Sequence, residues 1–310
     1  MKRLSISNVN LLYLFMALLL IILGSFVQSI DAESGLIATE FILVLLPAAL
    51  FAIWTRGGMK KIFRLNRLSL SEGILIVSII FLFYPISITG NMIVINLLDS
   101  IGWYRPIPFP SASNVNEYAL LLFAVAISAG ICEEFFFRGV VMRAYERYGP
   151  KKAIFWTAVL FGFFHFNIQN LLGPIMLGIL FGYFVYVTDS IYAGVLAHAT
   201  HNALSVTIGF LSVMNNNESP GAGAAAEGSV LIANVATIAI VILCAFVAGG
   251  LIRRLKRRSV EKLRMNNDVR LEEAHAEGDS TAMEPVPWWG YIPISIVGVV
   301  YVLFEMVSRR

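Results

Sequence analysis

Charge is what this sequence has least of. Only 14% of its 310 residues are Asp, Glu, Lys or Arg, whereas an average soluble domain carries roughly 25%. So little charge excludes a disordered chain, and the remaining composition excludes a collagen-like or coiled-coil protein. In its place, 58% of the residues are hydrophobic. They stand in long runs, which indicates a membrane protein.

Cysteine is almost as scarce. The chain has two cysteines, Cys132 and Cys244, and both lie inside apolar runs. This excludes a disulfide framework and a cysteine-rich zinc site. The net charge is only +3, and the basic residues stand in short blocks between hydrophobic runs. We therefore expect no binding of nucleic acid.

The hydrophobic runs predict an all-α fold, a polytopic transmembrane helical bundle. A helix needs about 20 apolar residues to cross the hydrocarbon layer, and on that measure the chain has about eight to nine spans. They lie near residues 9–28, 36–54, 74–98, 118–142, 153–167, 170–187, 190–212, 230–251 and 288–307. The first run resembles a signal peptide, but no cleavage site stands out after it, so a retained helix is favoured.

Composition divides the chain into five expected segments. They are N-terminal transmembrane helices with an interfacial segment (1–116), a catalytic transmembrane core (117–212), an external loop with a helix (213–252), a charged cytoplasmic linker (253–286) and a C-terminal helix (287–310).

The basic blocks predict the orientation. Most lysines and arginines fall near residues 2–3, 56–67, 143–152 and 253–264, all on one side of an alternating topology. By the positive-inside rule that side is the cytoplasm. We expect a multi-pass protein of a prokaryotic cytoplasmic membrane.

Several polar side chains stand where lipid should forbid them. Ionisable groups inside a span are costly and therefore suggest function. At a rise of about 1.5 Å per residue, the ionisable groups of three different spans lie at comparable depth in the membrane. One such group alone would most simply serve helix packing. Glu40, near the outer end of the second predicted span, is interpreted as reaching the membrane surface or pairing structurally. The others form a cluster: Glu133, Glu134, Arg138, His165, His198, His201 and Asn202.

Helix geometry divides this cluster into roles. Glu134 and Arg138 are four residues apart, so they can form an ion pair on one face. Glu133 is rotated by about 100° from its neighbour. It can therefore face elsewhere and act as a general base. His198 and Asn202 are again four residues apart and share one face.

Three motifs in this order resemble those of a known family. They are Glu133-Glu134-x-x-x-Arg138, Phe161-x-x-x-His165 and His198-x-x-x-Asn202. The set is similar to that of the CAAX-processing and bacteriocin-processing (CPBP, formerly Abi) intramembrane proteases, which include the type II CAAX prenyl endopeptidases. The resemblance covers residues 117–205.

This resemblance implies peptide-bond hydrolysis by an activated water. Glu133, with His165, would activate the water that attacks the scissile carbonyl. His198 and Asn202 would form the oxyanion hole, where preorganised donors meet the developing charge. The substrate would be a peptide or a membrane-anchored protein in the lipid bilayer, either CAAX-type or a bacteriocin-like peptide. We expect the active site to open to the cytoplasm.

The resemblance also implies supporting residues and raises the question of a metal. Glu134 and Arg138 would hold the site in shape. No cofactor is expected. Zinc remains an alternative, because an earlier view of the family as metalloproteases would make Glu133, His165 and His198 its ligands.

Functions of other classes also remain open at this point. The same polar groups could line the path of a transporter, or the chain could be an inactive membrane scaffold or immunity protein. Among proteases, the sequence lacks His-Glu-x-x-His, Gly-x-Ser-x-Gly and a pair of intramembrane aspartates. The glutamate-dependent protease is therefore the favoured function.

Overall fold

The computed structural model describes residues 4–55, 57–105, 111–215, 227–274 and 286–308. Regular structure in these residues is helical throughout, so the predicted all-α class is confirmed. The first half contains α1 (Ile6–Leu19), η1 (Leu20–Gly24), α2 (Ser25–Ile30), α3 (Ala32–Ala38), η2 (Thr39–Leu45), α4 (Leu46–Trp54), α5 (Met59–Ile62), α6 (Leu70–Ser100), α7 (Val115–Leu121), η3 (Leu122–Ser128), α8 (Ala129–Glu134), η4 (Phe135–Val141), α9 (Met142–Tyr145) and η5 (Glu146–Tyr148). The second half contains α10 (Pro150–Phe163), η6 (Ile168–Asn170), α11 (Leu172–Thr188), α12 (Ile191–Met214), α13 (Glu227–Ala274), η7 (Trp288–Tyr291) and α14 (Ile292–Ser308).

Within the described residues, 7 helical stretches are long and apolar enough to cross a membrane. They correspond to seven of the nine predicted spans. The other two are the helices α10 and α12. The helix α10 has only 14 residues, and α12 carries the polar residues of the seventh predicted span. The expected external loop falls largely on residues 216–226, which lie outside the described residues.

The helices begin and end where local chemistry requires. Ser69 and Glu72 form a reciprocal capping box that starts α6, which satisfies two backbone donors at that end. The side chain of Asp31 accepts from a backbone N–H at the start of α3, so the first two spans separate there. Gly149 has a φ of 90° and precedes Pro150 at the start of α10. These two residues end the helical structure of the fourth span and start α10 as a separate helix.

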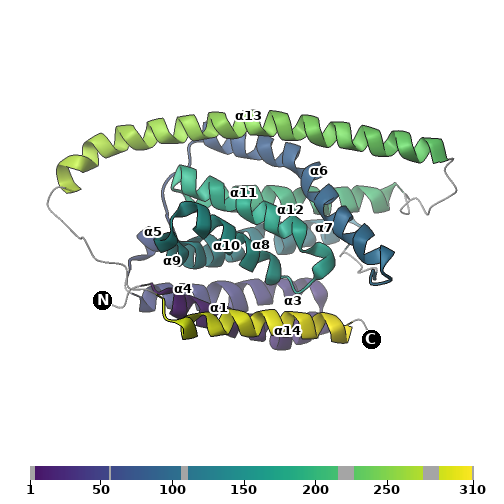
Figure 1. Cartoon of the computed structure of the whole chain (residues 1–310), viewed down its shortest axis with the longest axis horizontal. Helices are drawn as coiled ribbons and strands as arrows, with labels where there is room; N and C mark the ends of the chain where they lie inside the picture. Colours follow the sequence, from purple (N-terminus) through teal and green to yellow (C-terminus); the bar gives the residue numbers. More distant parts are fainter. Residues whose placement is uncertain (1–3, 56, 106–110, 216–226, 275–285, 309–310) are drawn as a thin grey trace.

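The bundle is layered (Figure 1). The helices α1 and α14 pack together on one side, and α13 packs along α6 on the other. The helices that carry the predicted site, α8, α10, α11 and α12, lie between these layers. The helices α5 and α9, beside two of the basic blocks, lie at the same end as the N-terminus, as the alternating topology requires.

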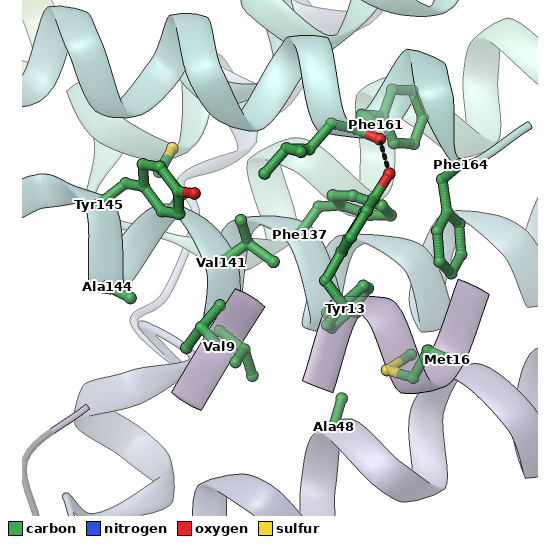
Figure 2. Close-up of a cluster of buried hydrophobic side chains, with 14 of the residues drawn as sticks. Val9, Tyr13, Met16, Ala48, Phe137, Val141, Ala144, Tyr145, Phe161 and Phe164 are labelled. Atoms are coloured by element: carbon green, nitrogen blue, oxygen red, sulfur yellow. Dashed lines mark hydrogen bonds between the residues drawn. The ribbon is translucent and has the colours of Figure 1, made fainter. Parts of the chain in front are cut away.

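An aromatic cluster joins the first helix to the site-bearing layer (Figure 2). Tyr13 of α1 is buried among Phe137, Phe161 and Phe164. Its hydroxyl donates to the Leu160 carbonyl at 2.8 Å, because a buried tyrosine needs a partner for its O–H. The first helix is thus part of the core.

The helix α13 is attached to the rest of the bundle mainly through α6. Its candidate span, Val235–Lys262, is almost entirely exposed to the surroundings of the bundle. Near the basic end, the buried Glu72 carboxylate accepts from Ser259 Oγ and from Lys262 Nζ, both at 2.9 Å. Glu72 therefore both caps α6 and fixes α13 to it.

A glycine lets the helices α10 and α11 approach closely. A Cβ at Gly178 would lie 2.9 Å from Cα of Ala158, which no larger residue tolerates without a backbone shift. This matches the packing role expected for small residues spaced along a transmembrane helix. The carbonyl of Gly178 also accepts a hydrogen bond from the Arg138 side chain, at 3.2 Å.

Candidate active site

One cavity, of about 670 Å³, brings the predicted catalytic residues together. Glu133 of α8, His165 after α10, and His198 and Asn202 of α12 all line it. The sequence predicted that these residues lie at comparable depth in the membrane, and in the structure they line the same cavity.

Glu134 faces away from this cavity into a fully buried ion pair. Its Oε1 accepts from Arg138 Nη1 at 2.6 Å, and both side chains are 0% exposed. The same Oε1 lies 3.0 Å from Nδ1 of His198. The predicted pair of Glu134 and Arg138 is thus present. It also reaches across to the neighbouring helix, which the spacing could not indicate.

The surroundings of Arg138 compensate for its burial. Its guanidinium lies 4.5 Å from the centre of the Phe161 ring and 5.4 Å from that of Phe181, at distances where a cation is attracted to an aromatic face. Phe181 also stacks on the His198 ring at 5.3 Å. The phenylalanines thus form the wall between the ion pair and the cavity.

Gly194 of α12 makes room for the carboxylate. A Cβ at this position would lie 2.5 Å from Oε2 of Glu134, well inside the contact distance. Only glycine lets α12 approach the Glu134 carboxylate in this way. Sequence reasoning missed this residue, because a glycine in a transmembrane helix has many packing roles.

His165 has a defined tautomer. Its Nδ1 lies 2.9 Å from the backbone carbonyl of Phe161. A carbonyl can only accept, so Nδ1 carries the proton and Nε2 of the neutral ring keeps its lone pair. Nε2 is therefore able to accept a hydrogen bond or a proton.

His198 is oriented in the same way by a carboxylate. Glu134 is held by Arg138 and accepts from it, so Nδ1 of His198 is the donor in their 3.0 Å contact. In the neutral ring Nε2 is then an acceptor. It becomes a donor only when the imidazole carries both protons. An oxyanion hole needs a donor, so the neutral form of His198 with this tautomer does not supply one through Nε2.

Asn202 is held by contacts on either side of its amide. Its Nδ2 donates to the Val125 carbonyl at 2.8 Å, within the π-helical turn η3. Such turns within helices are frequent at functional sites. Its Oδ1 lies 3.5 Å from Nδ1 of His201, and Nε2 of His201 is 3.0 Å from Ser87 Oγ. One Nδ2 hydrogen of Asn202 is thus engaged, and the amide has a second one.

Glu40, which the sequence assigned to packing or to the membrane surface, also lines the cavity. It belongs to the π-helical turn η2 and is 9% exposed. Glu133 and Glu40 each keep an Oε2 that is buried and accepts from no other described residue. In the sequence, Glu40 was marked only by being a carboxylate inside an apolar span, and the same feature marked Glu133.

Exposed residues at the end of the bundle opposite the basic loops line part of the cavity. Tyr104 and Arg105, which follow α6, and Asn170 between α10 and α11 are exposed and line it. At the other end, Arg64 binds Asp189 at 2.9 Å and also pairs with Glu146. These ion pairs tie the helix connections together at the basic end, whereas exposed polar lining residues of the cavity lie at the other end.

The described residues do not form a metal site. No group of three or more of their His, Cys, Asp and Glu side chains is arranged to hold a metal ion. The residues that zinc would need thus line one cavity without converging on a common point.

Together, the fold and the site define a polytopic helical membrane protein with carboxylates, imidazoles and an amide around a buried cavity. Residues 115–204 match the family model described as Type II CAAX prenyl endopeptidase Rce1-like. The match confirms the resemblance found in the motifs. No curated protein and no solved structure matches the chain.

Proposed function

We propose that this chain is a glutamate-dependent intramembrane endopeptidase. One observation carries the proposal: of two adjacent glutamates, Glu134 is neutralised by Arg138, whereas Glu133 lines a cavity shared with His165, His198 and Asn202. A carboxylate used only for packing would be expected to have a cationic partner of its own.

The proposed chemistry begins with a water between Glu133 and His165. Glu133 takes one proton as the water oxygen attacks the scissile carbonyl carbon, and Nε2 of His165 accepts a hydrogen bond from the same water. The C–N bond then breaks, and the proton on Glu133 goes to the leaving amine. Glu133 ends as it began, so no further reactant is needed.

The carbonyl oxygen becomes negative during attack and needs donors. The second Nδ2 hydrogen of Asn202 is one candidate. Nε2 of His198 is the other when the imidazole carries both protons. Donors of this kind, fixed in place before the reaction, are usually the largest single contribution to such catalysis.

The substrate in this proposal enters from the end opposite the basic loops. If the positive-inside rule holds, that end faces away from the cytoplasm. A segment of an exported peptide or of a membrane protein is then the preferred substrate. A prenylated protein delivered from the cytoplasm fits this entrance less well.

The test is to compare the membrane proteomes of cells that express the wild type or Glu133→Gln. Loss of a general base lowers turnover by about 10²–10⁴-fold, so at least one protein should accumulate uncleaved in the variant. Glu117→Gln is the matched control, because Glu117 caps the start of α7 through Ser113 and Asn114. It should leave the cleavage pattern unchanged.

Glu134→Gln distinguishes the two adjacent glutamates. It should lower the amount of folded protein, because Arg138 would keep its charge without a buried counterion. Cleavage that survives Glu133→Gln but is lost in a folded Glu134→Gln variant would reverse the roles assigned to them.

A further inference from the structure

A second cavity, of about 580 Å³, lies between α1, α10 and α14. Its size is within the range of small-ligand sites, about 300–1,000 Å³. The described residues that line it are all different from those that line the active-site cavity. Two of its three helices, α1 and α14, lie outside the segment that matches the family model. The proposed proteolysis therefore gives this cavity no role.

The walls of the second cavity are mainly apolar and aromatic. The helix α10 contributes Trp156 and Phe163, and α14 contributes Ile294 and Val297. Trp156 is 47% exposed, so this part of the lining belongs to the outer surface of the bundle, where a polytopic protein meets lipid. An apolar cavity beside lipid favours hydrocarbon as its occupant, because unfilled space leaves the wall atoms without dispersion contacts.

The length of the cavity fits one acyl chain. Along α10 the lining runs from Lys152 to Phe163, about 16 Å at the rise of an α-helix. The hydrocarbon core of a bilayer is about 30 Å thick, so one leaflet supplies about half of that. The cavity therefore extends from the basic end of the bundle over about the depth of one leaflet.

The tyrosine hydroxyls around the cavity already have partners. Tyr13 donates to a backbone carbonyl of α10 (Figure 2) and Tyr145 to an amide oxygen of α1, both at 2.8 Å. The hydroxyls of Tyr148 and Tyr291 bind each other. These bonds fix the walls to one another and leave Lys152 as the charged residue of the described lining.

The charge of Lys152 is not neutralised within the described part of the chain. Its side chain is exposed and no described carboxylate pairs with it, whereas the nearby Arg143 pairs with Glu146 at 2.7 Å. The first turn of α10 contains no acidic residue and has no side-chain cap, so the positive end of the helix dipole adds to the lysine charge. Basic residues at a membrane surface attract anionic head groups.

We propose that this cavity binds an anionic phospholipid from the leaflet at the basic end. One acyl chain lies between α1, α10 and α14, and the phosphate of the head group lies at Lys152. The bound lipid fills the cavity and joins α14 to α10. This site goes beyond the proposed protease function and does not depend on it, so it is tested by binding alone.

The experiment titrates purified full-length protein, freed of lipid in detergent, and counts bound molecules by native mass spectrometry. Phosphatidylglycerol should bind with one tight site per chain, and phosphatidylcholine with the same acyl chains should bind more weakly. Glycerol phosphate, which has the charge without the chains, should not bind in this range. Equal affinity for the two lipids would refute the role of the anionic head group. Binding of glycerol phosphate as tight as that of the lipid would refute the role of the acyl chain.

Two adjacent lysines test the position of the head group. Lys152→Gln should weaken binding of phosphatidylglycerol by about fivefold, the contribution of one basic residue at a membrane surface, and leave phosphatidylcholine unaffected. Lys151→Gln removes the same charge from an exposed residue that is not in the lining, and its binding should stay close to wild type. Equal losses in the two variants would show a general attraction to the basic surface and overturn the assignment.

A glycine in α14 tests the position of the chain. Gly298 lines the cavity, and a Cβ there would meet nothing within 4 Å. Gly298→Leu should weaken binding of both lipids by about fourfold for each methylene group that the leucine displaces. Gly249→Leu, at an equally open position in α13, is the control and should bind as the wild type does. Thermal unfolding without lipid identifies the folded variants, and unchanged binding by folded Gly298→Leu would overturn the proposal.

Photocrosslinking tests the same site without any substitution. Phosphatidylglycerol with a photoreactive group in its acyl chain should label residues of the cavity wall such as Trp156 and Val297. Phe246 of α13, which is 74% exposed, reports contact with lipid in general. Labelling that favours α13 over the cavity wall would refute the site, even if Gly298→Leu does not fold.

Discussion

At the scale of the residue, the amide of Asn202 provides the sharpest test of transition-state stabilisation. Its contacts with Val125 and His201 already hold it in place, so truncation removes a donor without creating a buried charge. Asn202→Ala should lower kcat by about 10²–10³-fold, as loss of one oxyanion donor does elsewhere. Thermal unfolding should be nearly unchanged.

His201→Ala serves as the comparison for Asn202→Ala. The imidazole of His201 contacts the Asn202 amide and Ser87 and is not assigned to the reaction, so its loss should be milder. If His201→Ala proves more damaging to kcat than Asn202→Ala, the oxyanion donor has been assigned to the wrong residue of α12.

We also predict that hydrolysis needs no tightly bound metal. No group of three or more His, Cys, Asp and Glu side chains in the described part of the chain is arranged to hold a metal ion. Mass spectrometry of purified protein should find less than one equivalent of zinc per chain, and activity should survive chelation. One equivalent of zinc, lost with activity in His165→Ala and in His198→Ala, would restore the metalloprotease mechanism.

The sequence predicted individual residues well wherever one helix fixes their relation. The pair of Glu134 and Arg138 follows from a spacing of four, which places two side chains on the same face. The bond between Glu134 and His198 joins different helices. Such contacts depend on how the helices are rotated, which the spacing within one helix does not indicate.

At the scale of the element, the existence of the helices was predictable and their pairing was not. Long apolar runs mark the spans, and residues such as Ser69 mark where a helix begins. A helix that is apolar on all sides, however, has no stripe to show which face meets a neighbour. The close packing of α8 on α12 therefore appears only in the structure.

Gly194 tests this packing. Gly194→Ala would place a Cβ 2.5 Å from Oε2 of Glu134, so α12 must shift and the bond from Glu134 to His198 must weaken. We expect a loss of about 1–3 kcal/mol in stability, typical of overpacking, together with reduced turnover. The measurements are thermal unfolding and the cleavage assay.

Gly249→Ala is the control for this substitution. Nothing lies within 4 Å of a Cβ at Gly249 in α13, and alanine favours a helix over glycine by up to about 1 kcal/mol. Stability should stay the same or rise slightly. If the Gly194 and Gly249 variants behave alike, the steric role given to Gly194 is refuted.

At the scale of the whole molecule, the basic loops lie at the end opposite Tyr104, Arg105 and Asn170, which are exposed and line the cavity. The charge pattern predicts which way the bundle crosses the membrane. It contains no information on which end is closed, because that depends on contacts such as that of Arg64 with Asp189. The combination predicts that substrate reaches the site from the non-cytoplasmic side.

Cysteine labelling in intact cells tests this orientation. Ser100, at the end of α6 nearest the mouth, and Lys151, at the start of α10, are both exposed. With an impermeant maleimide, Ser100→Cys should react at once, whereas Lys151→Cys should react only after the cells are permeabilised. The unsubstituted chain, with Cys132 buried and Cys244 partly buried, provides the background. The reverse pattern would turn the mouth toward the cytoplasm, and proteins delivered from the cytoplasm would then be the preferred substrates.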